Sequence, residues 1–286
     1  MRRRWMAAVG ALVLVQAPIE VEAGSKCPNV VILLDASDSM NQPPDSSTRE
    51  KKIVIAKRVL NQVLLGDTDA GLPAPNVGLR FGFTYFPSAT ACQPGPTSPM
   101  PAECEYGHNA QVAQAINAVT LHTSTPTSQA LDAVGATGDL VDNTRPRYVL
   151  LVTDGKPTCG ADHDNESIRA VGRLYSAGVG TFVVGFGTVA SDPQAVGVLN
   201  GMAAAGQAPV GDGGASFYPA TDEASLIQSL TSILRKTSGE LGQTGCDPCL
   251  DLSCDAHSRC VVEASGPKCH FDPCLGVTCG SGQFCE

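Results

Sequence analysis

Continuous apolar runs alternate along the chain with segments in which apolar residues recur every three or four positions. Residues 29–35 (NVVILLD) form a run without polar interruption, which is typical of a strand buried on both faces. Further strands are predicted at residues 77–86, 147–153, 181–186 and 217–218. Helical spacing predicts helices at residues 50–65, 110–119, 128–141, 166–177, 192–205 and 221–235. This alternation predicts an α/β fold with a doubly wound, mostly parallel sheet flanked by helices.

The first 23 residues have the pattern of a secretory signal peptide. Three arginines at positions 2–4 precede an apolar run at residues 5–17, and residues 21–23 offer small side chains for cleavage. A membrane anchor is the alternative, but the run is shorter than the roughly 20 residues that a span needs. We therefore expect export, with no membrane span after cleavage.

Charge and cysteine usage divide the remaining chain. The net charge of −9 argues against nucleic acid as a partner. Residues 24–240 contain four cysteines, whereas residues 241–286 contain eight, so the first region is expected to be built around a core and the second around disulfides. The cysteine-rich tail repeats D-P-C-x4-C-x5-C with a period of 25 residues, and its second unit is incomplete. The protein is therefore expected outside the cell or on its surface.

Carboxylates and hydroxyls follow the ends of two predicted strands and precede one helix. Asp35, Ser37 and Ser39 follow the first strand, and Asp154 follows the strand at residues 147–153. Thr125 lies before the helix predicted at residues 128–141. The carboxyl ends of parallel strands share one rim of the sheet, where ligands bind in open α/β folds. Oxygen ligands of this kind suit a hard divalent cation such as Mg²⁺.

Three motifs in this order resemble the von Willebrand factor type A domain and its metal ion-dependent adhesion site. They are D-x-S-x-S at residues 35–39, T-P-T-S-Q-A-L at 125–131 and L-L-V-T-D-G at 150–155, and the resemblance covers about residues 27–236. It implies a divalent cation, Mg²⁺ foremost with Ca²⁺ or Mn²⁺ as alternatives. The metal-site residues that it implies are Asp35, Ser37, Ser39, Thr125 and Asp154.

Two neighbouring positions qualify that resemblance. Thr127 is expected to cap the following helix rather than to bind the metal. Asp38 stands where the family commonly has glycine. Its carboxylate either adds charge that favours Ca²⁺ or points to solvent.

The resemblance implies a metal-dependent adhesion module, which binds an acidic group of an extracellular or surface protein. One alternative is a structural or assembly component whose ion only stabilises the loops. A more remote one is a metal-dependent hydrolase, for which Asp38 is the only spare carboxylate nearby. The loop at residues 87–108 is expected to overhang the metal rim and to contribute to partner recognition.

The pairing of the first four cysteines is partly constrained by the predicted topology. Cys27 precedes the first strand and Cys246 follows the last helix, so both should lie at the rim opposite the metal site and could form a disulfide. Cys92, Cys104 and Cys159 are expected at the metal rim, and the sequence leaves open which two of them pair. The tail resembles EGF-like or follistatin-like modules, and its connectivity is equally open.

Overall fold

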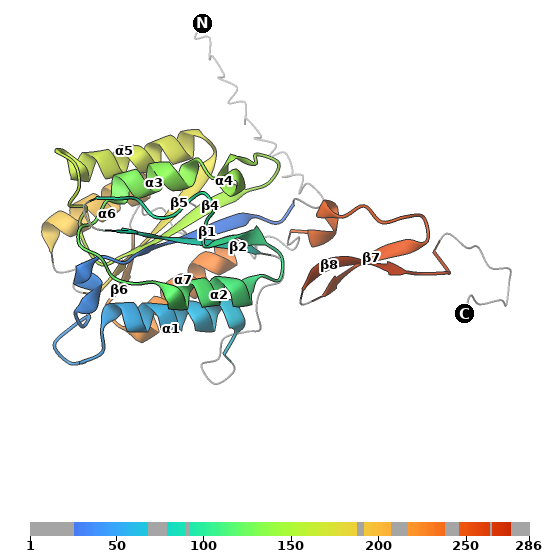
Figure 1. Cartoon of the computed structure of the whole chain (residues 1–286), viewed down its shortest axis with the longest axis horizontal. Helices are drawn as coiled ribbons and strands as arrows, with labels where there is room; N and C mark the ends of the chain where they lie inside the picture. The colour runs from blue at the N-terminus through green and yellow to red at the C-terminus, as the bar shows by residue number, and fades with distance from the viewer. Residues whose placement is uncertain are drawn as a thin grey trace, which may run out of the picture.

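A six-stranded sheet with helices on both faces forms the body of the protein (Figure 1). The computed structural model describes residues 26–67, 79–89, 92–187, 192–206, 217–237, 246–263 and 265–275. The predicted signal peptide at residues 1–23 and the boundary predicted between residues 240 and 241 lie outside this part of the chain. Within it, no helix is both long and apolar enough to cross a membrane.

The sheet order is β3-β2-β1-β4-β5-β6, and every neighbouring pair is parallel except β2 and β3. This confirms the predicted fold class. The strands are β1 (Asn29–Asp35), β2 (Arg80–Phe86), β3 (Ala102–Glu105), β4 (Arg147–Thr153), β5 (Val179–Phe186) and β6 (Tyr218–Ala220). The helices are α1 (Lys52–Leu65), α2 (Asn109–Ala118), α3 (Thr127–Gly135), α4 (Gly138–Val141), α5 (His163–Ser176), α6 (Pro193–Gly206) and α7 (Glu223–Thr237). The segment predicted as one helix at residues 128–141 is thus divided into α3 and α4.

Burial on both faces explains why the central strands could be recognised from their composition. All seven residues of β1 are buried. Val30, Ile32 and Leu34 pack towards α1, α2 and α7. Val31 and Leu33 pack on the other side towards α3, α5 and α6. A strand sandwiched in this way needs apolar side chains at successive positions, and β4 follows the same rule.

Local capping fixes where helices α5 and α7 end or begin. The Asp222 carboxylate accepts a hydrogen bond from the backbone N–H of Ser225 at 2.8 Å, so Asp222 is the N-cap of α7. Gly178, with φ of 79°, ends the turn after α5, where a residue with a side chain would be strained. Both helices begin and end within three residues of the bounds predicted from the sequence.

The position of Cys104 corrects one expectation. Cys104 was expected at the metal rim, but it lies in β3, which runs back antiparallel to β2. Its carbonyl accepts a hydrogen bond of 2.6 Å from Arg80, the first residue of β2, so it lies towards the opposite rim. The segment at residues 87–108, expected to overhang the rim at the carboxyl ends of the parallel strands, therefore includes a part, β3, that runs back towards the opposite rim. Among the described cysteines, Cys104 is buried and has no disulfide.

The cysteine-rich tail forms a small two-stranded sheet at the end of the molecule opposite the carboxyl ends of the parallel strands (Figure 1). It contains the short helix η4 (Pro248–Asp251) and strands β7 (Ser258–Glu263) and β8 (Gly266–Phe271). Its described disulfides are Cys249–Cys260 and Cys254–Cys269. Asp247 and Asp272 open the two sequence repeats. The carboxylate of each accepts a hydrogen bond from the backbone N–H of the second residue after it. The EGF-like or follistatin-like assignment stays a prediction.

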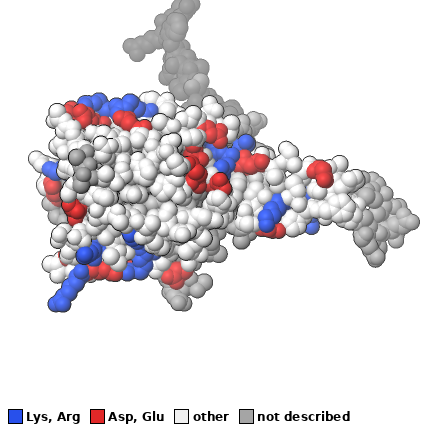
Figure 2. Space-filling view, in the orientation of Figure 1, with Lys and Arg blue, Asp and Glu red and all other residues white. Residues whose placement is uncertain are grey.

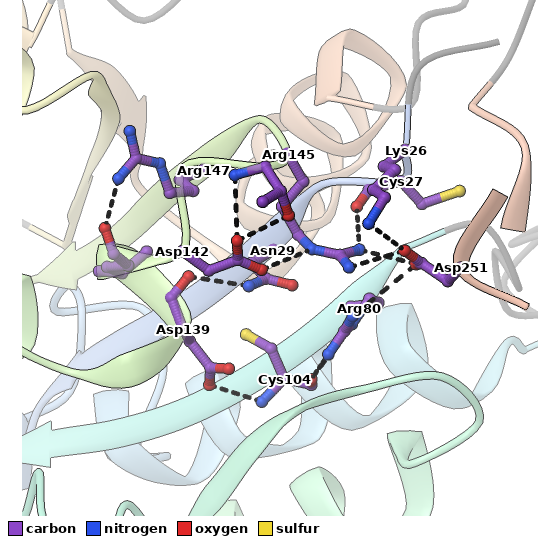
Figure 3. A network of polar contacts seen from close by, with 12 residues as sticks. Lys26, Cys27, Asn29, Arg80, Cys104, Asp139, Asp142, Arg145, Arg147 and Asp251 are labelled. Carbon is purple, nitrogen blue, oxygen red and sulfur yellow. Dashed lines mark hydrogen bonds and ion pairs between the residues drawn. The ribbon is translucent and has the colours of Figure 1, made fainter.

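One disulfide and one ion-pair cluster fasten the tail to the body. The Cys27–Cys246 disulfide that the topology allowed is present. Beside it, Asp251 of η4 accepts two hydrogen bonds of 2.9 Å from Arg145 and one of 2.7 Å from Tyr106. Figure 3 shows Arg145, Lys26 and Arg80 directed at this carboxylate, and Figure 2 shows charged side chains gathered at the junction.

This cluster predicts a pH dependence of stability. Burial raises the pKa of Asp251, but hydrogen bonds from Arg145 and Tyr106 and the charge of Arg145 outweigh it and lower the pKa from 3.8 to about 2. The stabilisation is therefore complete above pH 3.8 and is lost as the pH falls through about 2. We expect a loss of about 1–2 kcal/mol in the free energy of unfolding across that window. Urea titrations at pH 5 and pH 2 should show it in the wild type and show a smaller loss in Asp251→Asn.

Candidate metal centre

The end of β1 places a fully buried carboxylate at the rim of the sheet. Asp35 accepts a hydrogen bond of 2.9 Å from the backbone N–H of Ser37 and one of 2.6 Å from the Thr153 hydroxyl. Burial and the charge of Asp154 raise the pKa of Asp35 to about 7, against the lowering effect of these hydrogen bonds. A buried carboxylate with this much charge repulsion is stabilised in its ionised form by a nearby cation.

A chain of hydrogen bonds joins the other predicted residues of the first and fourth strands. The hydroxyl oxygens of Ser37 and Ser39 lie 2.9 Å apart, and Ser39 donates to Asp154 Oδ1 at 2.7 Å. Ser37 and Asp154 are buried, whereas Ser39 is exposed. The two strand ends therefore bring two hydroxyls and a carboxylate together, with Asp35 beneath Ser37.

Thr125 approaches the same rim from the loop before α3. Its backbone carbonyl accepts a hydrogen bond of 3.0 Å from Thr158, and its N–H donates to the Thr158 hydroxyl at 2.8 Å. These bonds tie Thr125 to the loop that follows Asp154. Thr125 is 6% exposed, and none of its described hydrogen bonds joins it to the two serines or the two aspartates.

The prediction for Thr127 was wrong. Thr127 is the first residue of α3 and Pro126 occupies the N-cap position, where no side chain makes a capping hydrogen bond. The Thr127 hydroxyl is buried without a hydrogen-bond partner. Asp38 begins the short helix η1 (Asp38–Asn41) and is exposed, as expected if its carboxylate points to solvent.

A disulfide links the loops around Thr125. Cys92 forms its disulfide with Cys159, which settles the pairing that the sequence left open. The Cys92 backbone N–H also donates a hydrogen bond of 3.0 Å to the hydroxyl oxygen of Ser124. Three loops, after β2, before α3 and after β4, are thereby linked next to the candidate site.

Lys52 is a component of the site that the sequence did not reveal. Its ammonium lies 2.5 Å from Asp154 Oδ2, and both side chains are almost completely buried. Thr153, which binds Asp35, was also missed. No signal in the sequence pointed to Lys52, because only the structure shows that this lysine at a helix N-terminus is buried, where a cation is disfavoured unless it has a partner.

The donor set fits a hard divalent cation. Two carboxylates and two hydroxyls supply oxygen ligands, which Mg²⁺ and Ca²⁺ prefer over nitrogen or sulfur. In the described parts of the chain, no group of three or more His, Cys, Asp or Glu residues could hold a metal. Any ion at this rim would therefore depend on the hydroxyls, as the D-x-S-x-S spacing implies.

Comparison with solved structures relates the architecture to known proteins. The pilus adhesin SpaC of Lactobacillus rhamnosus GG shares 10% identity over 76% of this chain and 32% of its own, with a TM-score of 0.53. The minor pilin PilB of Streptococcus sanguinis shares 13% identity over 77% of this chain and 63% of its own, with a TM-score of 0.51. Proximal thread matrix protein 1 of the mussel byssus shares 18% identity over 57% of this chain, with a TM-score of 0.37.

At 10% and 13% identity, the matches to SpaC and PilB show a shared fold and nothing further. The chain spans less than two thirds of the length of each of the three proteins, including 38% of the byssus protein. A comparison with curated proteins found no match. The sequence profile of the von Willebrand factor type A domain, in contrast, matches residues 29–232, which are most of the chain. The chain therefore belongs to the von Willebrand factor type A domain family.

Proposed function

We propose that the protein is a secreted or cell-surface adhesion-type module that binds another protein through a divalent cation. Asp35, Ser37, Ser39, Thr125 and Asp154 would hold the ion, with Mg²⁺ as the first choice. The observation that carries the proposal is the hydrogen-bonded series Ser37–Ser39–Asp154 above the buried Asp35. The proposal includes a domain at residues 24–240 and a separate cysteine-rich segment at residues 241–286.

The chemistry of the site supports an acidic partner group. Hydroxyl ligands are neutral, so an ion held partly by Ser37 and Ser39 keeps much of its positive charge. Such an ion attracts a carboxylate that can complete its coordination shell. The described disulfides suit an oxidising compartment, in agreement with a role outside the cell.

Removing the two hydroxyls should abolish cation binding without unfolding the domain. The double variant Ser37→Ala/Ser39→Ala is expected to bind Mg²⁺ about 100-fold more weakly or worse, because it loses two oxygen ligands at once. Isothermal titration calorimetry on the full chain measures this. Ser46→Ala, at an exposed serine in the loop before α1, is the matched control and should bind as the wild type does.

Partner binding requires a separate measurement. Capture of proteins from the native extracellular material should require Mg²⁺ and be lost in EDTA and in the double variant. If capture persists in EDTA while the metal-free protein merely melts at a lower temperature, the ion has only a structural role and the adhesion proposal is wrong. If the wild type binds no divalent cation, the metal site itself is wrong.

A further inference from the structure

Lys52 places a buried positive charge inside the candidate metal centre. It is the first residue of α1, and its side chain is 7% exposed. Its ammonium lies 2.5 Å from Asp154 Oδ2, while Asp154 Oδ1 accepts the hydrogen bond from Ser39. The two oxygens of one carboxylate thus face different partners, one a fixed cation and the other the pair of hydroxyls.

The fold makes room for this lysine. The Lys52 backbone N–H donates to the Gln42 carbonyl at 2.9 Å, which anchors the start of α1. Gly187 lies over the aliphatic stem, and a Cβ added there would come within 2.8 Å of Lys52 Cδ. Burying a lysine at a helix N-terminus is unfavourable in itself, since the helix dipole repels the cation and burial removes its hydration. Its pairing with Asp154 compensates for both effects.

The charge count of the centre changes with Lys52. When both carboxylates, Asp35 and Asp154, are ionised, they and the one ammonium leave the cluster with one net negative charge. A divalent ion would reverse this to one net positive charge, whereas the same site without the lysine would become neutral. Charges this close and this buried interact strongly, because little water screens them.

We infer that Lys52, as a built-in counter-charge beside Asp154, weakens the hold of the centre on its divalent cation. This inference rests on the proposed function and names how that site is tuned. The lysine also leaves the cation-loaded centre with a positive charge, which favours an anionic group on the partner.

Neutral substitutions at position 52 test the inference with Mn²⁺ alone as the probe. Lys52→Gln removes the charge and keeps a hydrogen-bond donor, while Lys52→Met removes both. Calorimetric titration of the full chain should show Mn²⁺ binding about tenfold or more tighter in both variants than in the wild type. Lys156→Met is the matched control, because Lys156 lies close in sequence but donates to Gln194 at 2.6 Å, and its affinity should not change.

Thermal stability separates tuning from a purely structural role. Without metal, both variants should melt below the wild type, since Asp154 loses its counter-charge. Saturating Mn²⁺ should then raise their melting temperature by more than it raises that of the wild type. A lysine that only supports the fold would lower stability equally with and without the ion. If Lys52→Met does not fold, Lys52→Gln still tests the inference.

The outcomes distinguish this inference from the proposal on which it rests. Unchanged or weaker Mn²⁺ binding in both position-52 variants, with normal binding by the wild type, overturns the role of Lys52 and leaves the metal site intact. Failure of the wild type and of every variant to bind Mn²⁺ overturns the metal site and, with it, this inference.

Discussion

Replacing both Cys27 and Cys246 by serine should lower the free energy of unfolding by about 5 kcal/mol. The disulfide joins residues 219 positions apart, so its removal frees a loop that contains every strand of the main sheet. Loop-closure entropy increases with the length of the enclosed chain, which makes this the costliest of the described disulfides to remove. Guanidinium titration followed by circular dichroism measures the loss.

A second disulfide provides the control. Cys254 and Cys269 are 15 positions apart and lie in the tail, so Cys254→Ser/Cys269→Ser should cost about 3 kcal/mol and leave the unfolding transition of the main sheet in place. Equal losses from the two double variants would contradict the loop-entropy argument. In that case the stability of the main sheet would not depend on the covalent link between its ends.

The sequence predicted the parts of the fold that depend on burial and on the rules of parallel sheets. The bounds of β1 and β4 were predicted correctly, because a strand covered on both faces has to be apolar at successive positions. The edge strand β3 was not predicted. Its sequence, AECE, has two charged residues and no β-branched residue, and only its pairing with β2 identifies it. The misplacement of Cys104 followed from this omission.

The candidate site shows a similar division. Ser37, Ser39 and Asp154 come together as expected, because each follows a strand whose carboxyl end meets the same rim. Lys52 could not be placed from sequence. It lies 17 positions after Asp35 beyond a loop, and whether a long side chain turns into a site or into solvent depends on packing around Gly187. The motifs therefore identify the candidate oxygen ligands but not the ammonium group of Lys52 beside them.

Asp251→Asn should lower the free energy of unfolding by about 3 kcal/mol at pH 7 and loosen the tail from the body. The Arg145 side chain is only 5% exposed, and the substitution removes the carboxylate that accepts two of its hydrogen bonds. A buried guanidinium without its counter-charge is costly, even though Asp142 remains 3.2 Å away. Denaturant titration gives the energy, and small-angle X-ray scattering reports whether the tail keeps its orientation.

The tail itself offers the control for this substitution. Asp255 is an exposed carboxylate in the same segment, and Asp255→Asn should change neither stability nor shape by a measurable amount.

The second sequence repeat has glycine at position 276, where the first has Asp251, so the docking carboxylate belongs to the repeat that contacts the body. Because Asp251 and the serines of the metal rim lie at opposite ends of the sheet, Mg²⁺ affinity should not change in Asp251→Asn. A joint loss of tail orientation and Mg²⁺ binding would instead show that the two ends of the sheet are coupled.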